Sequence, residues 1–123
     1  MNLPTTLTPI QIRFSDLDPL GHVSNNAYSE YLEQGRVGWL DAIAGERPSV
    51  VVASLKIDFL RELRLRDEIA VATRCIHKGN KSLVLSQEIF RGADCVTRAE
   101  VVIVGFDLKT RQSVVLLEGW EPS

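Results

Sequence analysis

One segment of the chain has the period of a helix, whereas nearly every other regular segment has the period of a strand. Between residues 25 and 44, apolar and aromatic side chains recur every three or four residues, which puts them on one face of a helix of about five turns. These side chains are Tyr28, Tyr31, Leu32, Trp39, Leu40 and Ile43. A single long helix with such a face must be covered by a sheet, because strands are the other elements that the sequence offers.

The ends of this helix carry their own signals. Ser24 or Asn25 is suited to the N-cap, Gly45 to the residue after the C-terminal cap, and Pro48 prevents continuation. Gly35 and Gly38 lie inside the helix, where each costs about 1 kcal/mol relative to alanine. Such glycines indicate that another element packs closely on the helix.

The strand-like segments are joined by short turns. The alternation of apolar and polar residues predicts strands over 10–14, 50–60, 68–76, 82–91 and 95–106, with 113–117 either a final edge strand or a tail. Residues 77–81 and 91–94 have the composition of hairpin turns. Turns this short join only antiparallel neighbours. The sequence therefore predicts an α+β fold in which a curved antiparallel sheet wraps around one long helix.

Size and composition fit one domain spanning residues 1–123. The chain has 123 residues, of which 45% are hydrophobic and 24% charged, so it can bury a core without disulfides or a metal. Cys75 and Cys95 each lie in an alternating apolar run and lack the spacing of a zinc site, which favours reduced core thiols in a cytoplasmic protein.

Charge and hydropathy exclude several classes of partner. The formal net charge of −2 gives no global attraction to nucleic acid or to an acidic membrane. No apolar run approaches the ~20 residues of a membrane-spanning helix, and the first residues resemble no secretion signal. We therefore expect a soluble cytoplasmic protein that binds neither nucleic acid nor membrane.

The loop before the helix contains the strongest candidates for catalytic residues. Asp16, Asp18 and His22 lie within seven residues that lead to the N-terminus of the helix, where unpaired backbone N–H groups favour a developing negative charge. One interpretation is a carboxylate that acts as nucleophile or general base beside an oxyanion site, with His22 as acid–base partner. The other interpretation is structural, because Asp-x-Asp-Pro-x-Gly also makes a good turn.

Three stretches of the chain resemble a known family. The window from Asp16 to Tyr31 (DLDPLGHVSNNAYSEY), with Glu33 and Arg36 further along the helix, is similar to the signature of hotdog-fold thioesterases of the 4-hydroxybenzoyl-CoA thioesterase type. Residues 57–67 resemble the family's second-strand motif, and residues 79–83 resemble its next hairpin. The similarity covers roughly residues 10–108 and implies a hotdog fold.

The resemblance also implies roles for individual residues. Asp18 matches the carboxylate that attacks the thioester carbonyl or activates water, and the backbone N–H of Asn25 matches the oxyanion donor. His22 matches a histidine found in one branch of the family, and Tyr28 is either an acyl-pocket or a packing residue. No metal or redox cofactor is implied. A glutamate on the helix is the catalytic group in another hotdog branch, and Glu33 is the nearest candidate here. With Asp18 present, we interpret Glu33 as a structural partner of Arg36.

Departures from the family pattern lie at the end of the second strand. Glu62 stands where the family commonly has proline, and Arg66 where it commonly has glycine. Basic residues near predicted strand ends are candidates for contacts with the phosphates of coenzyme A at one mouth of the pocket. They are Arg61, Arg64, Lys78 and Lys81.

The sequence thus predicts an acyl-CoA thioesterase that hydrolyses a thioester to a carboxylic acid and CoA. An acyl group on acyl carrier protein is an alternative substrate. The exposed sheet edges and the family resemblance predict a homodimer or homotetramer with the active site between subunits. Two other functions remain open, namely a hotdog hydratase or dehydratase that uses His22 and Asp18, and a non-catalytic acyl-binding module.

Overall fold

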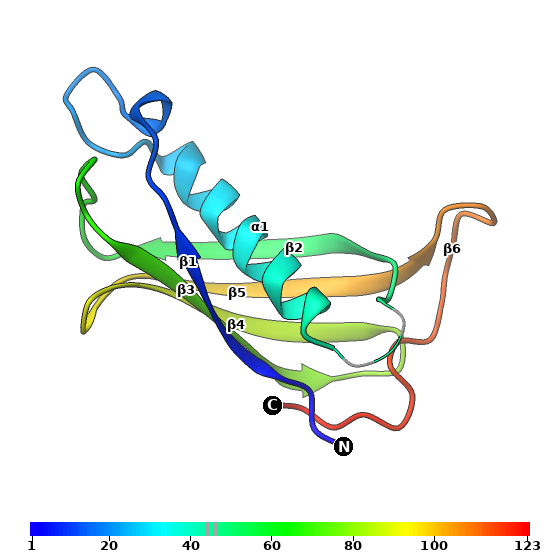
Figure 1. The fold of residues 1–123 in the computed structure, drawn as a ribbon. Coiled ribbons are helices and arrows are strands. Elements are labelled where there is room, and N and C mark those ends of the chain that lie inside the picture. Colours follow the sequence, from blue (N-terminus) through cyan, green and yellow to red (C-terminus); the bar gives the residue numbers. More distant parts are fainter. Residues whose placement is uncertain (44, 46) are drawn as a thin grey trace.

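The chain forms one antiparallel sheet with a long helix across one of its faces (Figure 1). The computed structural model describes residues 1–43, 45 and 47–123. Its elements are β1 (Thr5–Ile10), the short 3-10 helix η1 (Phe14–Asp16), α1 (Asn25–Asp41), β2 (Val50–Phe59), β3 (Ile69–Lys78), β4 (Ser82–Arg91), β5 (Asp94–Asp107) and β6 (Gln112–Ser113). The strand order is β1-β3-β4-β5-β2, and β6 pairs with β5.

The long strands lie where the alternation of the sequence predicted them, but the first strand does not. β1 spans Thr5–Ile10, so the predicted strand over 10–14 is wrong. Ile10 pairs with Ile69, the first residue of β3, and residues 11–14 therefore run past the end of their neighbour with no ladder to join. At the other end of the chain, only residues 112–113 form a strand, and most of 113–117 is a tail.

Helix α1 begins at Asn25, with Ser24 at the N-cap as expected, and its last helical residue is Asp41. The predicted end at Ala44 lies outside the described residues. Ala42 is the C-terminal cap, so the prediction that Gly45 directly follows the cap is wrong, although Gly45 does have a positive φ of 92°. The predicted stripe is buried, from Tyr28 at 3% exposed to Trp39 at 0%.

Gly35 lets α1 approach the sheet closely. A Cβ atom at this position would lie 2.5 Å from Cγ1 of Val71 on β3, much closer than real side chains come. At Gly38 the corresponding neighbour is Oγ1 of Thr8 on β1, at 2.6 Å. The two glycines that weaken the isolated helix thus bring it onto β1 and β3, as the sequence indicated.

A buried polar cluster lies between the helix and the middle of the sheet. Nη1 of Arg36 donates to Oε1 of Gln87 at 3.1 Å, and Nε2 of Gln87 donates to Oγ1 of Thr73 at 2.9 Å. The expected ion pair between Glu33 and Arg36 is wrong, because the guanidinium turns under the helix toward Gln87 while Glu33 stays exposed. Burial lowers the pKa of Arg36 from its usual value.

Both cysteines are free, as expected for reduced thiols. Cys75 is buried in the core, whereas Cys95 is only half-buried beside Glu88. Burial raises the pKa of each thiol, so both remain in the protonated, unreactive form near neutral pH.

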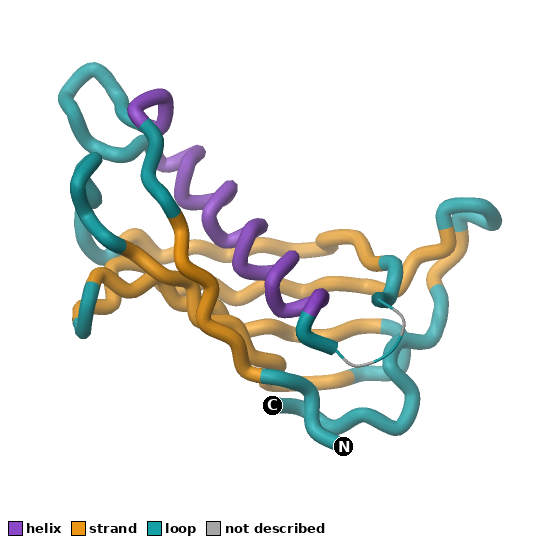
Figure 2. Tube along the Cα trace, in the orientation of Figure 1, coloured by secondary structure: helices purple, strands orange, loops and turns teal. Residues whose placement is uncertain are grey.

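Of the long strands, β2 is covered least by the rest of the chain. α1 packs mainly on β1 and β3, which lie at the other end of the strand order from β2. Figure 2 shows the helix lying obliquely across the strands of the sheet. Leu55 and Phe59, whose partners on β5 are buried, remain 39% and 45% exposed. β2 is also the last strand of the ladder, and within the described residues nothing pairs with its outer edge. None of the described helices is long and apolar enough to span a membrane.

Candidate active site

The loop between η1 and α1 folds into a small hairpin. Leu17 and Val23 form an isolated antiparallel bridge, and the N–H of Asp18 donates to the carbonyl of His22 at 2.7 Å. The turn closes through the N–H of Gly21, which donates to the carbonyl of Asp18 at 3.0 Å. Gly21 has φ of 81°, a conformation that glycine adopts without strain. The Pro-x-Gly sequence therefore makes the turn that its composition predicts.

Asp16 holds this loop to the helix. Its side chain is 4% exposed, accepts a hydrogen bond of 2.6 Å from the Tyr31 hydroxyl, and accepts two from the Arg13 guanidinium at 2.8 and 3.2 Å. The backbone N–H of Arg13 also donates to Oδ2, at 2.9 Å. Arg13 continues to Glu30 on α1 at 2.9 Å. Asp16 is therefore a structural carboxylate.

The surroundings of Asp16 favour its charged form. Burial by itself raises the pKa of Asp16, but the hydrogen bonds from Tyr31 and Arg13 outweigh this effect and leave the pKa below its usual value. Burial and the bond to Asp16 raise the pKa of the Tyr31 phenol, so it remains a donor. The pair is thus a neutral phenol and an ionised carboxylate near neutral pH.

Asp18 is placed quite differently. It is half-buried, and its Oδ1 accepts hydrogen bonds from the backbone N–H groups of Leu20 and His22, at 2.9 and 3.1 Å. Within the described part of the chain, Oδ2 takes part in no hydrogen bond. One oxygen of Asp18 thus stabilises the turn, as the structural interpretation predicts, and the other is available for chemistry.

Asp18 lies on a cleft of about 280 Å³ at the N-terminal end of α1. Of the eight residues predicted for the site, five line this cleft, namely Asp18, His22, Asn25, Tyr28 and Arg61. The remaining wall consists of Val23, Phe59, Leu60 and Glu62. Carboxylate, imidazole and a helix N-terminus therefore meet apolar side chains in one hollow.

The first turn of α1 faces this cleft through Asn25. The N–H groups of a first turn have no partner within the helix, and the Ser24 side chain makes no capping bond. The positive end of the helix dipole adds to their attraction for negative charge. The backbone at Asn25 is thus suited to bind an oxyanion.

Aromatic side chains form the inner wall. The Tyr28 ring meets those of Tyr31 and Phe59 edge to face, with centroids 6.3 and 5.2 Å apart. The Tyr28 hydroxyl donates to the carbonyl of Arg61 at 3.3 Å. Tyr28 therefore packs in the core and also borders the cleft.

The other predicted basic residues lie apart from the cleft. Arg64 follows in the same loop but does not line it, and its backbone N–H is bound to Asp67 at 2.8 Å. Lys78 and Lys81 lie at the β3–β4 turn, at the opposite end of the sheet (Figure 1). Ten residues of strand separate the two ends by about 30 Å. One chain therefore does not bring the four basic residues to one mouth.

Glu62 is a charged cleft residue that the sequence did not assign to the site. Its Oε2 lies 3.4 Å from Nε2 of His22. The only signal in the sequence was its departure from the proline common in related chains. The pairing of a loop after β2 with a loop before α1 has no local pattern by which it can be predicted.

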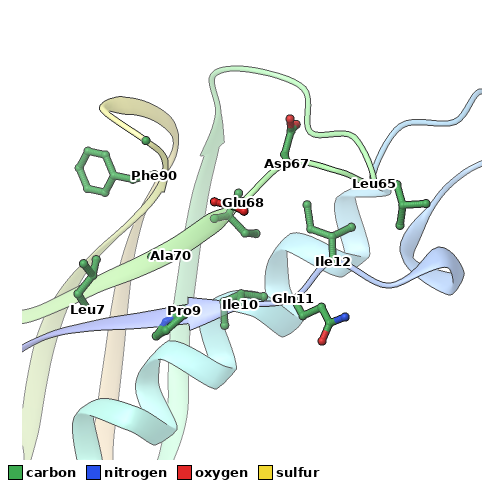
Figure 3. Close-up of a pocket in the computed structure, with 12 residues that line it drawn as sticks. Leu7, Pro9, Ile10, Gln11, Ile12, Leu65, Asp67, Glu68, Ala70 and Phe90 are labelled. Carbon is green, nitrogen blue, oxygen red and sulfur yellow. The ribbon is translucent and has the colours of Figure 1, made fainter.

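A larger cavity lies elsewhere. It has a volume of about 710 Å³ and lies beside β1 and the start of β3 (Figure 3). Its wall includes Leu7, Pro9, Leu65 and Phe90, but none of the residues predicted for the site. Among the described residues, no group of three or more His, Cys, Asp or Glu is arranged to hold a metal ion.

A single long helix laid across one antiparallel sheet is the arrangement of the hotdog fold. A family model of the thioesterase-like superfamily matches residues 12–119, and the chain belongs to this superfamily. The fold and family predicted from the sequence are thereby confirmed.

Named relatives and a solved structure agree with this assignment. The long-chain acyl-CoA thioesterase FadM of Escherichia coli K12 is 29% identical in an alignment 117 positions long that covers 89% of this chain and 89% of FadM. The acyl-CoA thioester hydrolase YbgC of Escherichia coli O157:H7 is 26% identical in an alignment 115 positions long that covers 87% of this chain and 86% of YbgC. A thioesterase from Thermus thermophilus, solved with coenzyme A and zinc, has a TM-score of 0.84 at 28% identity and covers 95% of this chain and 94% of its own. The expected enzyme class, thioester hydrolase, is that of these relatives.

Replacing Asp16 by Asn tests its structural role. We expect Asp16→Asn to lower the free energy of unfolding by about 2 kcal/mol at pH 7, because the amide loses the charge and turns a donor toward the donors of Arg13. Since the pKa of Asp16 is lowered by folding, its contribution is complete above about pH 4 and is lost as the pH falls through the lower folded-state value. Urea unfolding at pH 7 and at pH 3 measures both effects.

The exposed Asp94 in the β4–β5 turn provides the control. Asp94→Asn is expected to leave the stability nearly unchanged at either pH. An equal loss in the two variants, or a loss at Asp16 that does not shrink in acid, contradicts the structural role.

Proposed function

We propose that the chain hydrolyses an acyl-CoA to a free carboxylic acid and CoA. The observation that carries the proposal is the available carboxylate oxygen of Asp18 in the same cleft as the N-terminus of α1. The names of FadM and YbgC support acyl-CoA as the substrate class. Acyl carrier protein in place of CoA is compatible with the same chemistry.

The helix N-terminus stabilises the negative charge that develops on the carbonyl oxygen of the thioester. When a nucleophile attacks, this oxygen becomes an oxyanion, and the N–H of Asn25 donates a hydrogen bond to it. The helix dipole contributes in the same direction. These groups are fixed before the substrate arrives, so they stabilise the transition state without reorganisation.

Asp18 supplies the nucleophile in one of two ways. As general base it takes a proton from water, and the hydroxide forms the new C–O bond; as nucleophile its own oxygen forms that bond and gives an anhydride, which water then hydrolyses. In either route the C–S bond breaks and His22 gives a proton to the departing thiolate. The proton held by Asp18 in the first route, or released when water opens the anhydride in the second, then returns to His22. Water is thereby divided between the acid and the thiol.

The aromatic wall accommodates the acyl group. Tyr28 and Phe59 present ring surface to the cleft beside Leu60. These side chains attract apolar carbon and exclude water from the carboxylate. We infer that the acyl chain lies against this wall with its carbonyl toward Asn25.

Replacing Asp18 tests the proposal directly. Asp18→Asn keeps an oxygen for the N–H groups of Leu20 and His22 but removes the charge. We expect kcat to fall by ~10²-fold or more, with little change in the midpoint of thermal unfolding. Thiol release from short, long and aryl acyl-CoAs measures the activity, and Asp94→Asn is the control.

Three results are distinguishable in that assay. Thiol release by the unsubstituted chain that Asp18→Asn nearly abolishes supports hydrolysis through Asp18. Near-normal turnover of Asp18→Asn contradicts the role of this residue. Hydration of an enoyl-CoA without thiol release, or binding without turnover, contradicts the thioesterase itself.

We infer that two copies associate through β2. Its outer edge has free backbone groups, and Val52, Leu55 and Phe59 leave an apolar strip that is 39–47% exposed. A second copy of β2 satisfies the backbone and covers the strip in a symmetric contact. Because Phe59 also lines the cleft, the second subunit completes its wall. Pairs of such dimers give the alternative homotetramer.

The size of the protein in solution tests this association. We expect sedimentation at micromolar concentration to give at least twice the chain mass of 13.7 kDa. Val52→Asp puts a charge on the apolar strip and is expected to shift the protein toward monomer, whereas Leu7→Asp, an equally simple change on the opposite edge strand, is not. A fully active monomer contradicts the proposal.

The basic residues are proposed to bind the phosphates of CoA. Arg61 lines the cleft and Arg64 follows in its loop, so these two act from the same subunit. Lys78 and Lys81, at the far end of the sheet, meet the nucleotide only from the second subunit. Exposed arginines and lysines contribute mainly uniform binding, which changes KM rather than kcat.

A comparison of two substrates tests these contacts. We expect Arg61→Ala and Arg64→Ala to raise KM for an acyl-CoA about 3- to 10-fold and to leave KM for the matching acyl-pantetheine, which lacks the nucleotide, unchanged. Added salt should weaken acyl-CoA binding in parallel. The double variant Lys78→Ala/Lys81→Ala has the same effect if the second subunit contributes. Unchanged KM values in all variants contradict a nucleotide site here.

A further inference from the structure

Glu62 lies on the wall of the cleft, opposite the loop between η1 and α1 that carries Asp18 and His22. Its carboxylate oxygen Oε2 lies 3.4 Å from Nε2 of His22, and both residues line the cleft that contains Asp18. The contact joins the loop after β2 to the loop before α1.

The backbone around Glu62 is fixed by three successive hydrogen bonds. The carbonyl of Arg61 accepts from the Tyr28 hydroxyl at 3.3 Å, that of Glu62 from Nη1 of Arg91 at 3.0 Å, and that of Leu63 from the N–H of Val23 at 2.9 Å. The donors come from the helix, from β4 and from the loop between η1 and α1. The side chain of Glu62 is 66% exposed, but its point of attachment is held rigidly beside the loop.

The backbone of His22 is fixed just as firmly. Its N–H donates to Oδ1 of Asp18 at 3.1 Å, and its carbonyl accepts from the N–H of Asp18 at 2.7 Å. The positions of the imidazole and the Asp18 carboxylate are thus set by one turn, and only the side-chain torsions of His22 remain to be defined. Among the described residues, the ion pair recorded for the ring is with the carboxylate of Glu62.

We propose that Glu62 is a positioning residue that holds the His22 imidazole in its working orientation. This inference rests on the proposed thioesterase activity. The Glu62 carboxylate lies within ion-pair distance of Nε2 of His22, and its attraction for the N–H at that position restrains the ring torsion and leaves the other nitrogen, Nδ1, for the cleft. Glu62 itself touches neither the acyl group nor the attacking water.

Kinetics of a small set of variants test this role. Because the pair is exposed, Glu62→Ala should leave the thermal midpoint nearly unchanged, but lower kcat about 3- to 10-fold with less than a twofold change in KM. Glu62→Gln keeps an acceptor oxygen and should recover part of the loss. Glu68→Gln, an exposed carboxylate six residues further along, is the control and should change nothing.

A double-variant cycle shows whether Glu62 acts through His22. In the His22→Asn background, Glu62→Ala should cause no further loss, because the ring that it positions is gone. Losses that multiply overturn the proposal. A lower KM for acyl-CoA in Glu62→Ala, with kcat unchanged, also overturns it, because that result describes a carboxylate that repels phosphates.

Nuclear magnetic resonance tests the contact without any substrate. The chain has only two histidines, and His77 lies on β3 at the opposite end of the sheet. At a fixed pH, Glu62→Ala should shift the ring-proton signals of His22 and leave those of His77 in place, whereas Glu68→Gln should shift neither. Unchanged His22 signals overturn the proposal whatever the activity. If the unsubstituted chain releases no thiol while these signals shift, the proposed function fails and the contact stands.

Discussion

The buried carboxylate of Asp16 is the interaction on which the candidate site depends. It accepts hydrogen bonds from Tyr31 on α1 and from Arg13 before η1, and Arg13 reaches on to Glu30. The bonds from Tyr31 to Asp16 and from Arg13 to Glu30 join the segment before the loop to the helix after it. A buried ion is stabilising only when its partners are all in place, so the loop has one position relative to the helix. Because Asp18 lies only two residues further along the chain, its backbone is also held in place relative to the helix.

The sequence predicted the architecture because its signals were local. The aromatic stripe of the helix, the alternation of β2 to β5 and the tight turns each lie within one element. The position of β1 could not be read in this way. Whether residues 5–10 or 10–14 form the strand depends on where β3 begins, and β3 lies some sixty residues further along the chain. The alternation of residues 10–14 is genuine, but a strand also needs a neighbour.

The candidate site was predictable to the same extent. The sequence placed Asp16 and Asp18 together in one loop before the helix, and the structure gives them different surroundings, one buried among donors and one on a cleft. The partner of Arg36 was not predictable, because Gln87 lies on β4 and reaches the helix only in the folded chain. Glu62 was missed for the same reason, since its contact with His22 joins two loops that only the finished fold brings together.

A second constraint on the candidate site is the unpaired outer edge of β2. This strand ends at Phe59, which contacts Tyr28 on the cleft wall, and its outer edge has no partner within the described residues. The carbonyls of residues 61–63, which follow β2, accept hydrogen bonds from the helix, from β4 and from the loop between η1 and α1. Any movement of β2 is therefore transmitted to Glu62 and to the aromatic wall. In the proposed dimer, pairing of β2 with its copy holds this strand in place, so association and catalysis depend on the same element.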